Sequence, residues 1–225
     1  MKIALGLPHQ NERILAKFVD SLTGLIVHSL HQGVEIVRIA TYRDNITFAR
    51  NKISSKFLET DADYLFFLDD DMVFDPDTLI RLLKQDKEIV GGLTFIRSEP
   101  HEPSFYTKDS HDTYVPIYMW KKKALVECDA IGMASTLIKR SVFEKMKAVS
   151  QYHKNIYGFY DNIGFKGEDL SFCEKAKALK FKIHCDTEVL VGHLTDKVIG
   201  YGNYKAMADD SVLRLKKAIA LKNYK

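Results

Sequence analysis

Apolar and polar positions alternate along the first hundred residues in a way that predicts both strands and helices. Short apolar runs, each about one strand long, are separated by longer segments in which apolar residues recur every three or four positions. The predicted strands span 3–7, 34–40, 64–68 and 88–96, and the predicted helices span 11–30, 47–60 and 75–85. Strands that alternate with helices indicate an α/β fold with a mostly parallel central sheet flanked by helices.

The second half of the chain has a different pattern, with strand-like segments that follow one another directly. These segments span 104–109, 113–120 and 124–132, and they indicate a smaller antiparallel portion. Further on, the sequence predicts helices at 139–146 and 167–180, a strand at 182–194 and a Lys-rich helical pattern in 195–225. We therefore expect a single domain over residues 1–194 and a basic helical tail over 195–225.

The composition is that of an ordinary globular chain and excludes few functions. The 225 residues are 46% apolar and 28% charged, and the formal net charge of +3 is too small to indicate nucleic-acid or membrane binding. No apolar run approaches the ~20 residues of a membrane-spanning helix. The three cysteines are an odd number without a CxxC pair, so they suggest neither a disulfide framework nor a zinc site. A reducing, cytoplasmic location is therefore expected.

Three consecutive aspartates, Asp69, Asp70 and Asp71, follow the predicted strand YLFFL. Two neighbouring negative charges at ~4 Å repel by roughly 4 kcal/mol at an effective dielectric of ~20, so the arrangement favours a bound cation. Residues i and i+2 of an extended chain face the same way, which lets Asp69 and Asp71 point at one spot. Ligands of open α/β sheets bind at the carboxyl ends of the strands, and carboxylates suit Mg²⁺ or Mn²⁺.

Other interpretations of the triplet were weighed. A solvated acidic turn before a helix is the plain structural alternative. A calcium-binding loop that starts at Asp69 does not fit, because Phe74 stands where glycine is required and Ile80 stands where glutamate is required. A phosphatase with an aspartyl nucleophile is a poor match, since the triplet follows the third strand and Met72 and Val73 come next.

Five segments in order along the chain resemble the GT-A fold glycosyltransferases, most closely the family 2 group. They are LGLPHQNERI (5–14), FARNKI (48–53), LFFLDDDMVFDPDTL (65–79, with the DxD metal motif), VECDAIGMASTLIKRSVFEKM (126–146) and GEDLSFCEKAKALKFKIHCDTEVLVGHL (167–194). The resemblance covers about residues 3–194. It implies a nucleotide-sugar-binding half at about 1–100 and an acceptor and catalytic half at 101–194.

The resemblance implies a transferase that moves a sugar from a nucleotide diphosphate-sugar, with UDP-sugars favoured, to a hydroxyl acceptor in the presence of Mn²⁺ or Mg²⁺. It places Asp71 as a direct metal ligand, Asp69 at the donor sugar, the ribose or the metal, and Asp70 at the ribose or the metal. His193 would complete the metal sphere, with a structural core or surface histidine as the alternative. The acceptor stays open between a glycan, a lipid-linked sugar, a protein side chain and a modified nucleic acid.

An acceptor hydroxyl loses its proton as it attacks, so an inverting enzyme needs a general base. The resemblance nominates Asp169 for this role and Glu168 as its neighbour that orients the acceptor or assists. A simple helix start is the alternative, because acidic residues stabilise a helix N-terminus. A retaining glycosyltransferase of the same fold, a metal-dependent nucleotidyltransferase and a binding module without catalysis are the other functions considered.

The remaining predicted contacts belong to the nucleotide and the acceptor. The resemblance implies a nucleotide pocket formed by Pro8, His9, Asn11 and Arg50, and the loop after the second strand adds Tyr42 and Asp44 for the base. The acceptor side is assigned to Gly132 and Trp120. Each has a structural alternative: Asn11 as a helix cap, Arg50 as a surface ion-pair partner and, as the favoured interpretation, Trp120 as a core aromatic.

Overall fold

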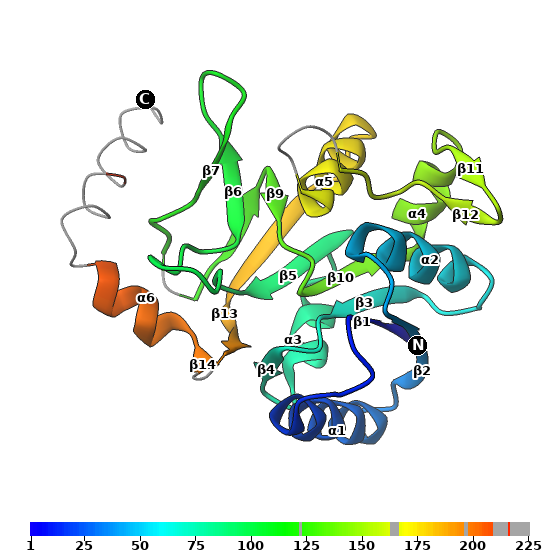
Figure 1. Cartoon of the computed structure of the whole chain (residues 1–225), viewed down its shortest axis with the longest axis horizontal. Coiled ribbons are helices and arrows are strands. Elements are labelled where there is room, and N and C mark those ends of the chain that lie inside the picture. Colours follow the sequence, from blue (N-terminus) through cyan, green and yellow to red (C-terminus); the bar gives the residue numbers. More distant parts are fainter. Residues whose placement is uncertain (122, 163–166, 196–197, 209–215, 217–225) are drawn as a thin grey trace.

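The computed structural model describes residues 1–121, 123–162, 167–195, 198–208 and Lys216 (Figure 1). The helices are α1 (Ala16–His31), α2 (Ile46–Leu58), α3 (Thr78–Lys84), α4 (Arg140–Lys147), α5 (Glu168–Ala178) and α6 (Tyr201–Ala208). The strands of the first half are β1 (Lys2–His9), β2 (Glu35–Tyr42), β3 (Tyr64–Leu68), β4 (Met72–Phe74) and β5 (Ile89–Leu93). Those of the second half are β6 (Phe105–Lys108), β7 (Tyr114–Pro116), β8 (Leu125–Cys128), β9 (Ala130–Ile131), β10 (Ser135–Lys139), β11 (Tyr152–His153), β12 (Ile156–Tyr157), β13 (Ile183–Leu194) and β14 (Val198–Ile199).

Within the described residues, the central sheet has nine strands in the order β14-β13-β5-β10-β3-β1-β2, with β4 and β8 also paired to β13. β1 is parallel to β2 and β3, and β5 is parallel to β13. β10 lies antiparallel between β3 and β5, so these two strands point the same way as each other. The α/β fold class expected from the sequence is confirmed: a mostly parallel sheet flanked by helices, with smaller antiparallel sheets in the second half.

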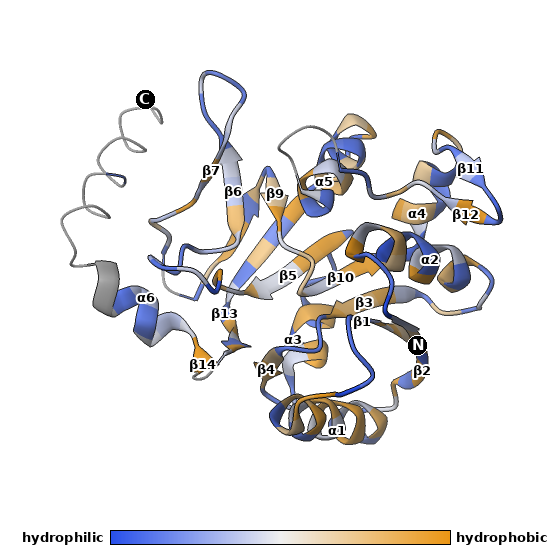
Figure 2. Cartoon of the chain, in the orientation of Figure 1, coloured by the Kyte–Doolittle hydropathy of each residue, from blue (hydrophilic) through white to orange (hydrophobic). Residues whose placement is uncertain are grey.

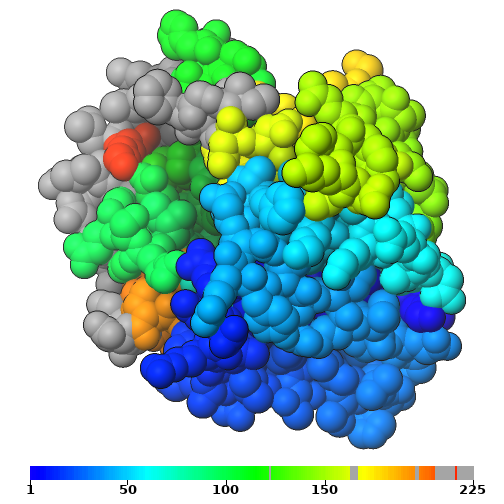
Figure 3. All heavy atoms as spheres, turned by 45° about the vertical axis from the view of Figure 1, so that its right-hand side comes forward, coloured from blue at the N-terminus to red at the C-terminus, as the bar shows by residue number. Residues whose placement is uncertain are grey.

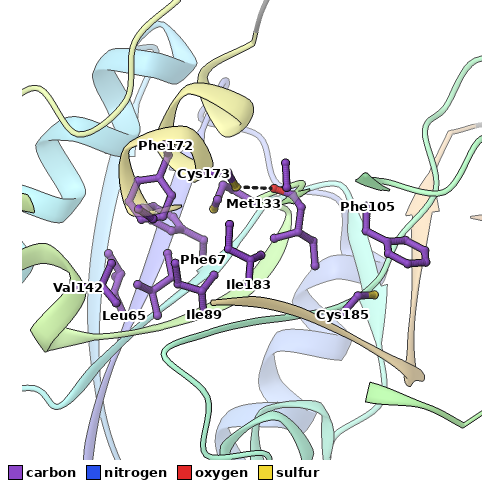
Figure 4. Packing of buried hydrophobic residues seen from close by; sticks show 14 of the residues in the cluster. Leu65, Phe67, Ile89, Phe105, Met133, Val142, Phe172, Cys173, Ile183 and Cys185 are labelled. Carbon is purple, nitrogen blue, oxygen red and sulfur yellow. Dashed lines mark hydrogen bonds between the residues drawn. The ribbon is translucent and has the colours of Figure 1, made fainter. Parts of the chain in front are cut away.

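The two faces of this sheet carry separate hydrophobic clusters. Alternate residues of β3 face opposite ways, because side chains of a strand repeat with a period of two. Leu65 and Phe67 pack in the cluster covered by α2, α4 and α5, whereas Phe66 and Leu68 pack in the cluster covered by α1 and α3. Figure 4 shows Leu65 and Phe67 beside Val142 of α4. In Figure 2 the hydrophobic colour is concentrated along β3 and β10 at the centre of the sheet.

The structure differs from the sequence prediction at the start of α1 and at β10. Helix α1 begins at Ala16 rather than at Asn11, because Ile14 and Leu15 are exposed and give no packing that would extend the helix. Residues 10–15 instead form a loop at the carboxyl end of β1. Strand β10 is absent from the predicted strands: its five residues run directly into α4, and the spacing of apolar residues there also fits a helix.

Helix α2 begins at Ile46, one residue before the predicted start at 47. The side chain of Asn45 accepts a hydrogen bond from the Thr47 N–H at 3.0 Å, which is a standard N-cap. This cap fixes the first turn of α2 next to the carboxyl ends of β1 and β3, where the acidic triplet emerges. Figure 3 shows the first third of the chain, in blue to cyan, filling the lower part of one face, with the yellow-green segment that contains α4 and the β11–β12 hairpin above it.

The predicted tail is described only in part. Helix α6 lies within it, and Tyr204 of that helix is buried, with its ring stacked on Trp120 at 5.6 Å and its hydroxyl donating to the Tyr118 carbonyl at 2.8 Å. Strand β14 pairs with β13 across the predicted boundary at 194, which stays a prediction. Of the helical pattern predicted over 195–225, residues 209–215 and 217–225 lie outside the described residues. Among the helices that are described, none is long and apolar enough to cross a membrane.

Candidate functional site

A polar cleft of about 380 Å³ lies where β1, β3 and β13 meet the start of α2 and α5. It brings together residues from well-separated parts of the chain. The predicted site residues that line it are Pro8, Asn11, Arg50, Asp69, Asp70, Asp71, Glu168, Asp169 and His193. The carboxyl ends of β1 and β3 lie side by side because the two strands are parallel neighbours, so the loop after β1 and the triplet after β3 form one wall.

Arg50 is the buried centre of an acidic cluster on one side of the cleft. Its side chain is 2% exposed, and Nη2 lies 3.1 Å from Asp69 Oδ2. Nε lies 3.3 Å from Glu168 Oε1 and 3.5 Å from Asp169 Oδ1. Burial lowers the pKa of Arg50, but the three surrounding carboxylates outweigh burial and raise the pKa above its usual value. The guanidinium therefore stays charged and ties α2, β3 and α5 together.

Asp169 has a pKa close to neutral pH, which suits a group that takes up and releases protons during a reaction. Burial raises its pKa to about 7, although Arg50 acts in the opposite direction. Oδ2 accepts a hydrogen bond from the Met133 N–H at 3.0 Å, whereas Oδ1 has no hydrogen-bond partner among the described residues. Met133 thus fixes one oxygen, while Arg50 Nε lies 3.5 Å from the other. Burial also raises the pKa of Asp69, whose Oδ1 is likewise without a hydrogen bond in the described structure.

Asp70 belongs to a second network, which runs outward through His9. His9 Nδ1 lies 3.0 Å from Asp70 Oδ2, and Arg38 Nη2 lies 3.2 Å from His9 Nε2. A guanidinium has donors only, so Nε2 must accept and Nδ1–H must donate to Asp70. The ring of Tyr42 stacks on His9 at 5.2 Å, and its hydroxyl accepts from Arg38 at 2.7 Å. This network fixes the tautomer of a histidine whose side chain is fully buried.

Asp71 faces His193 and Arg97 across the cleft. Its Oδ2 lies 3.2 Å from His193 Nε2 and 3.1 Å from Arg97 Nη2. Burial would raise the pKa of Asp71, but these two partners outweigh burial and lower it. Burial lowers the pKa of His193, but the Asp71 carboxylate outweighs burial and raises it. His193 Nδ1 donates to the Phe95 carbonyl at 3.0 Å, which leaves Nε2 as the nitrogen that meets the cleft.

A divalent cation in the cleft would need several oxygen or nitrogen atoms that face one point. No group of three or more His, Cys, Asp and Glu side chains in the described ranges converges as a complete metal site. Asp71 Oδ2 and His193 Nε2 do lie 3.2 Å apart on the cleft wall, so both can face one ion. Mg²⁺ and similar ions commonly take one or two carboxylates and complete their shell with water and substrate phosphates. Asp71 and His193 therefore fit a cation that takes a few ligands from the protein and the rest from water and substrate phosphates.

Other predicted site residues lie apart from the cleft lining. Tyr42 is half-exposed and reaches the site through His9. Asp44 pairs with Lys52 at 3.3 Å. Trp120 packs against Phe105 and Tyr204 and lines a separate pocket of about 180 Å³. A Cβ on Gly132 would lie 2.4 Å from Ser104 Oγ, so this glycine permits close packing of two backbones next to Met133.

Three arginines at or beside the cleft are absent from the predicted site residues. Arg13 and Arg97 both line it, and Arg38 holds His9. Arg97 follows the strand predicted at 88–96, so the rule that ligands gather at strand ends could have found it. Arg38 stands within β2, and nothing in its sequence neighbourhood signals a contact with β1. The Met133 N–H is a backbone group, which a search for functional side chains overlooks.

Comparison with solved structures shows the likeness of the fold. A197 from STIV is 21% identical over 89% of this chain and 94% of that chain, with a TM-score of 0.56, so the two share a fold. A Drosophila β-1,4-galactosyltransferase 7 variant in complex with manganese, UDP-Gal and xylobiose is 14% identical over 84% of this chain and 66% of that chain, with a TM-score of 0.48. No family model and no curated protein matches the sequence.

Proposed function

We propose that this chain is a metal-dependent glycosyltransferase that moves a sugar from a nucleotide diphosphate-sugar, with UDP-sugars favoured, to a hydroxyl acceptor with inversion. One observation carries the proposal. The acidic triplet, Arg50, the Glu168–Asp169 pair and His193 line a single cleft, although they are separated by up to 143 positions in the sequence (193 − 50). The cleft thus combines a cation position at Asp71 with a carboxyl of pKa about 7 at Asp169.

Asp71 and His193 are the residues that would hold Mn²⁺ or Mg²⁺, because their donor atoms face each other at 3.2 Å on the cleft wall. The cation would neutralise the negative charge that grows on the leaving diphosphate. Asp70 is held by His9 at 3.0 Å and is assigned to the ribose. Asp69 is assigned to the donor sugar, and this role is supported by its place in the cleft lining with a side chain that is 25% exposed.

Asp169 is assigned as the general base that takes the proton of the acceptor hydroxyl. A base works best when its pKa lies near the operating pH, and burial gives Asp169 a pKa of about 7. The Met133 N–H holds Oδ2 at 3.0 Å and Arg50 Nε lies 3.5 Å from Oδ1, so the carboxyl is positioned from both sides. Glu168 is a positioning residue, since its Oε1 is already bound to Arg50 Nε at 3.3 Å.

The experiment that tests the proposal uses water as the acceptor. UDP release from a panel of UDP-sugars is measured with and without Mn²⁺ for the wild type and Asp169→Asn, and pyrophosphate release from UTP is measured in parallel. We expect Mn²⁺-dependent UDP release that falls by about 10²-fold or more in the variant. Pyrophosphate release from UTP that survives Asp169→Asn, without UDP release from any sugar donor, would instead identify a nucleotidyltransferase.

A further inference from the structure

Arg97 stands at the cleft without a role in the mechanism above. It follows the last residue of β5 by four positions, and its side chain is 55% exposed. Arg97 Nη2 lies 3.1 Å from Asp71 Oδ2, and His193 Nε2 lies 3.2 Å from that same oxygen. One carboxylate oxygen therefore serves two nitrogen donors at the position that the proposed function gives to a divalent cation.

The two partners of Asp71 are held very differently. His193 lies in β13, is 17% exposed, and is fixed by the bond from Nδ1 to the Phe95 carbonyl at 3.0 Å. The ring can therefore stay in place and present Nε2 to a cation. Arg97 is largely exposed on a loop, and its described ion pair is the one with Asp71. Because like charges repel, a divalent cation at Asp71 Oδ2 would displace the guanidinium rather than the ring.

Once displaced from Asp71, the Arg97 guanidinium can bind a phosphate group in the same cleft. Arg50 also lines the cleft, but its guanidinium is already bound to Asp69 and Glu168. The displaced guanidinium of Arg97 would have unpaired N–H donors in one plane, and two of them can bind two phosphate oxygens at once. We propose that Arg97 is an exchangeable counter-ion, which neutralises Asp71 before ligand binds and moves onto the donor diphosphate when metal and nucleotide bind together. This inference rests on the proposed function.

The exchange predicts effects of opposite sign for two ligands. Arg97→Gln removes the competitor at Asp71, so Mn²⁺ without nucleotide should bind about two- to fivefold tighter, the equivalent of one exposed ion pair. The same variant loses a charged contact to the diphosphate, so UDP at saturating Mn²⁺ should bind about tenfold weaker or more. Free Mn²⁺ is measured by electron paramagnetic resonance and UDP binding by isothermal titration calorimetry.

Arg13→Gln is the matched control, because Arg13 lines the same cleft whereas the described ion pairs of Asp71 are with Arg97 and His193. Comparing the two variants separates the effect of losing the Arg97–Asp71 ion pair from the effect of losing one positive charge in the cleft. Mn²⁺ affinity in Arg97→Gln that does not exceed both the wild-type and the Arg13→Gln values would overturn the inference, as would unchanged UDP affinity. If the wild type binds UDP only with Mn²⁺, such a result refutes the exchange alone. If the wild type binds UDP equally well with and without Mn²⁺, both the proposed function and this inference are refuted.

Discussion

Replacing Arg50 by methionine tests whether one buried guanidinium holds the acidic cluster together. Methionine keeps an unbranched apolar stem of similar length but removes the charge. The change leaves Asp69, Glu168 and Asp169 without the cation that lies 3.1, 3.3 and 3.5 Å from them. It also removes the guanidinium from the ring of Phe67, whose centroid is 5.2 Å away.

The expected loss of stability is large because the site is buried. Removing one partner of a buried ion pair costs about 3–5 kcal/mol, since the remaining charge is left without compensation. For a chain of 225 residues this corresponds to a fall in Tm of roughly 6–20 °C. Arg81→Met is the control: Arg81 is 26% exposed, its Glu188 partner lies 3.8 Å away, and we expect a loss of about 1 kcal/mol or less.

The loss of stability in Arg50→Met should depend on pH. The folded-state pKa of Asp169, about 7, lies above the ~3.9 of an unfolded aspartate, so the folded protein binds the extra proton between these values. This contribution to stability therefore falls as the pH rises from about 4 to 7. Without Arg50 the pKa values of Asp69 and Asp169 rise further, so Arg50→Met should recover part of its stability at pH 5. Urea unfolding at pH 5 and 7.5 measures this. A loss below about 1 kcal/mol, or an equal loss at both pH values, would refute the reasoning.

Three further outcomes follow from single contacts. Log kcat/KM for sugar-donor hydrolysis should rise with pH and level off above the Asp169 pKa of about 7, and an unchanged rising limb in Asp169→Asn would exclude this base. Because Arg38 and Asp70 both require Nδ1–H on His9, ¹⁵N NMR of the imidazole should show a protonated Nδ1 and a bare Nε2, whereas the Nε2–H tautomer would contradict the network. Gly132→Ala places a Cβ 2.4 Å from Ser104 Oγ and should cost about 1–3 kcal/mol in urea unfolding, and adding Ser104→Ala should restore most of it.

The sequence predicted the parallel half of the fold well because its strands are short apolar runs bounded by polar loops. The triplet at 69–71 could be placed at a strand end for the same reason. Strand β10 was missed because a five-residue strand that runs straight into a helix has no boundary signal of its own. The late start of α1 was missed because the exposed Ile14 and Leu15 continue its apolar spacing.

The site was predicted in outline from a resemblance, and its electrostatics came only with the structure. That Arg50 lies between three carboxylates depends on how α2, β3 and α5 pack, which no local pattern encodes. The sharing of Asp71 by His193 and Arg97 likewise depends on the antiparallel pairing of β4 with β13, which sets Met72 opposite His193. Long-range contacts of this kind follow from sheet order rather than from spacing along the chain.

Isothermal titration of UDP and GDP, with and without Mn²⁺, into the wild type and Asp71→Ala tests whether the acidic triplet forms a metal-nucleotide site. We expect that a nucleoside diphosphate binds the wild type only when Mn²⁺ is present and that Asp71→Ala loses this binding. UDP should bind more tightly than GDP. Binding that is the same without Mn²⁺, or that survives Asp71→Ala, would contradict a metal-nucleotide site at the acidic triplet, as would the absence of binding under every condition.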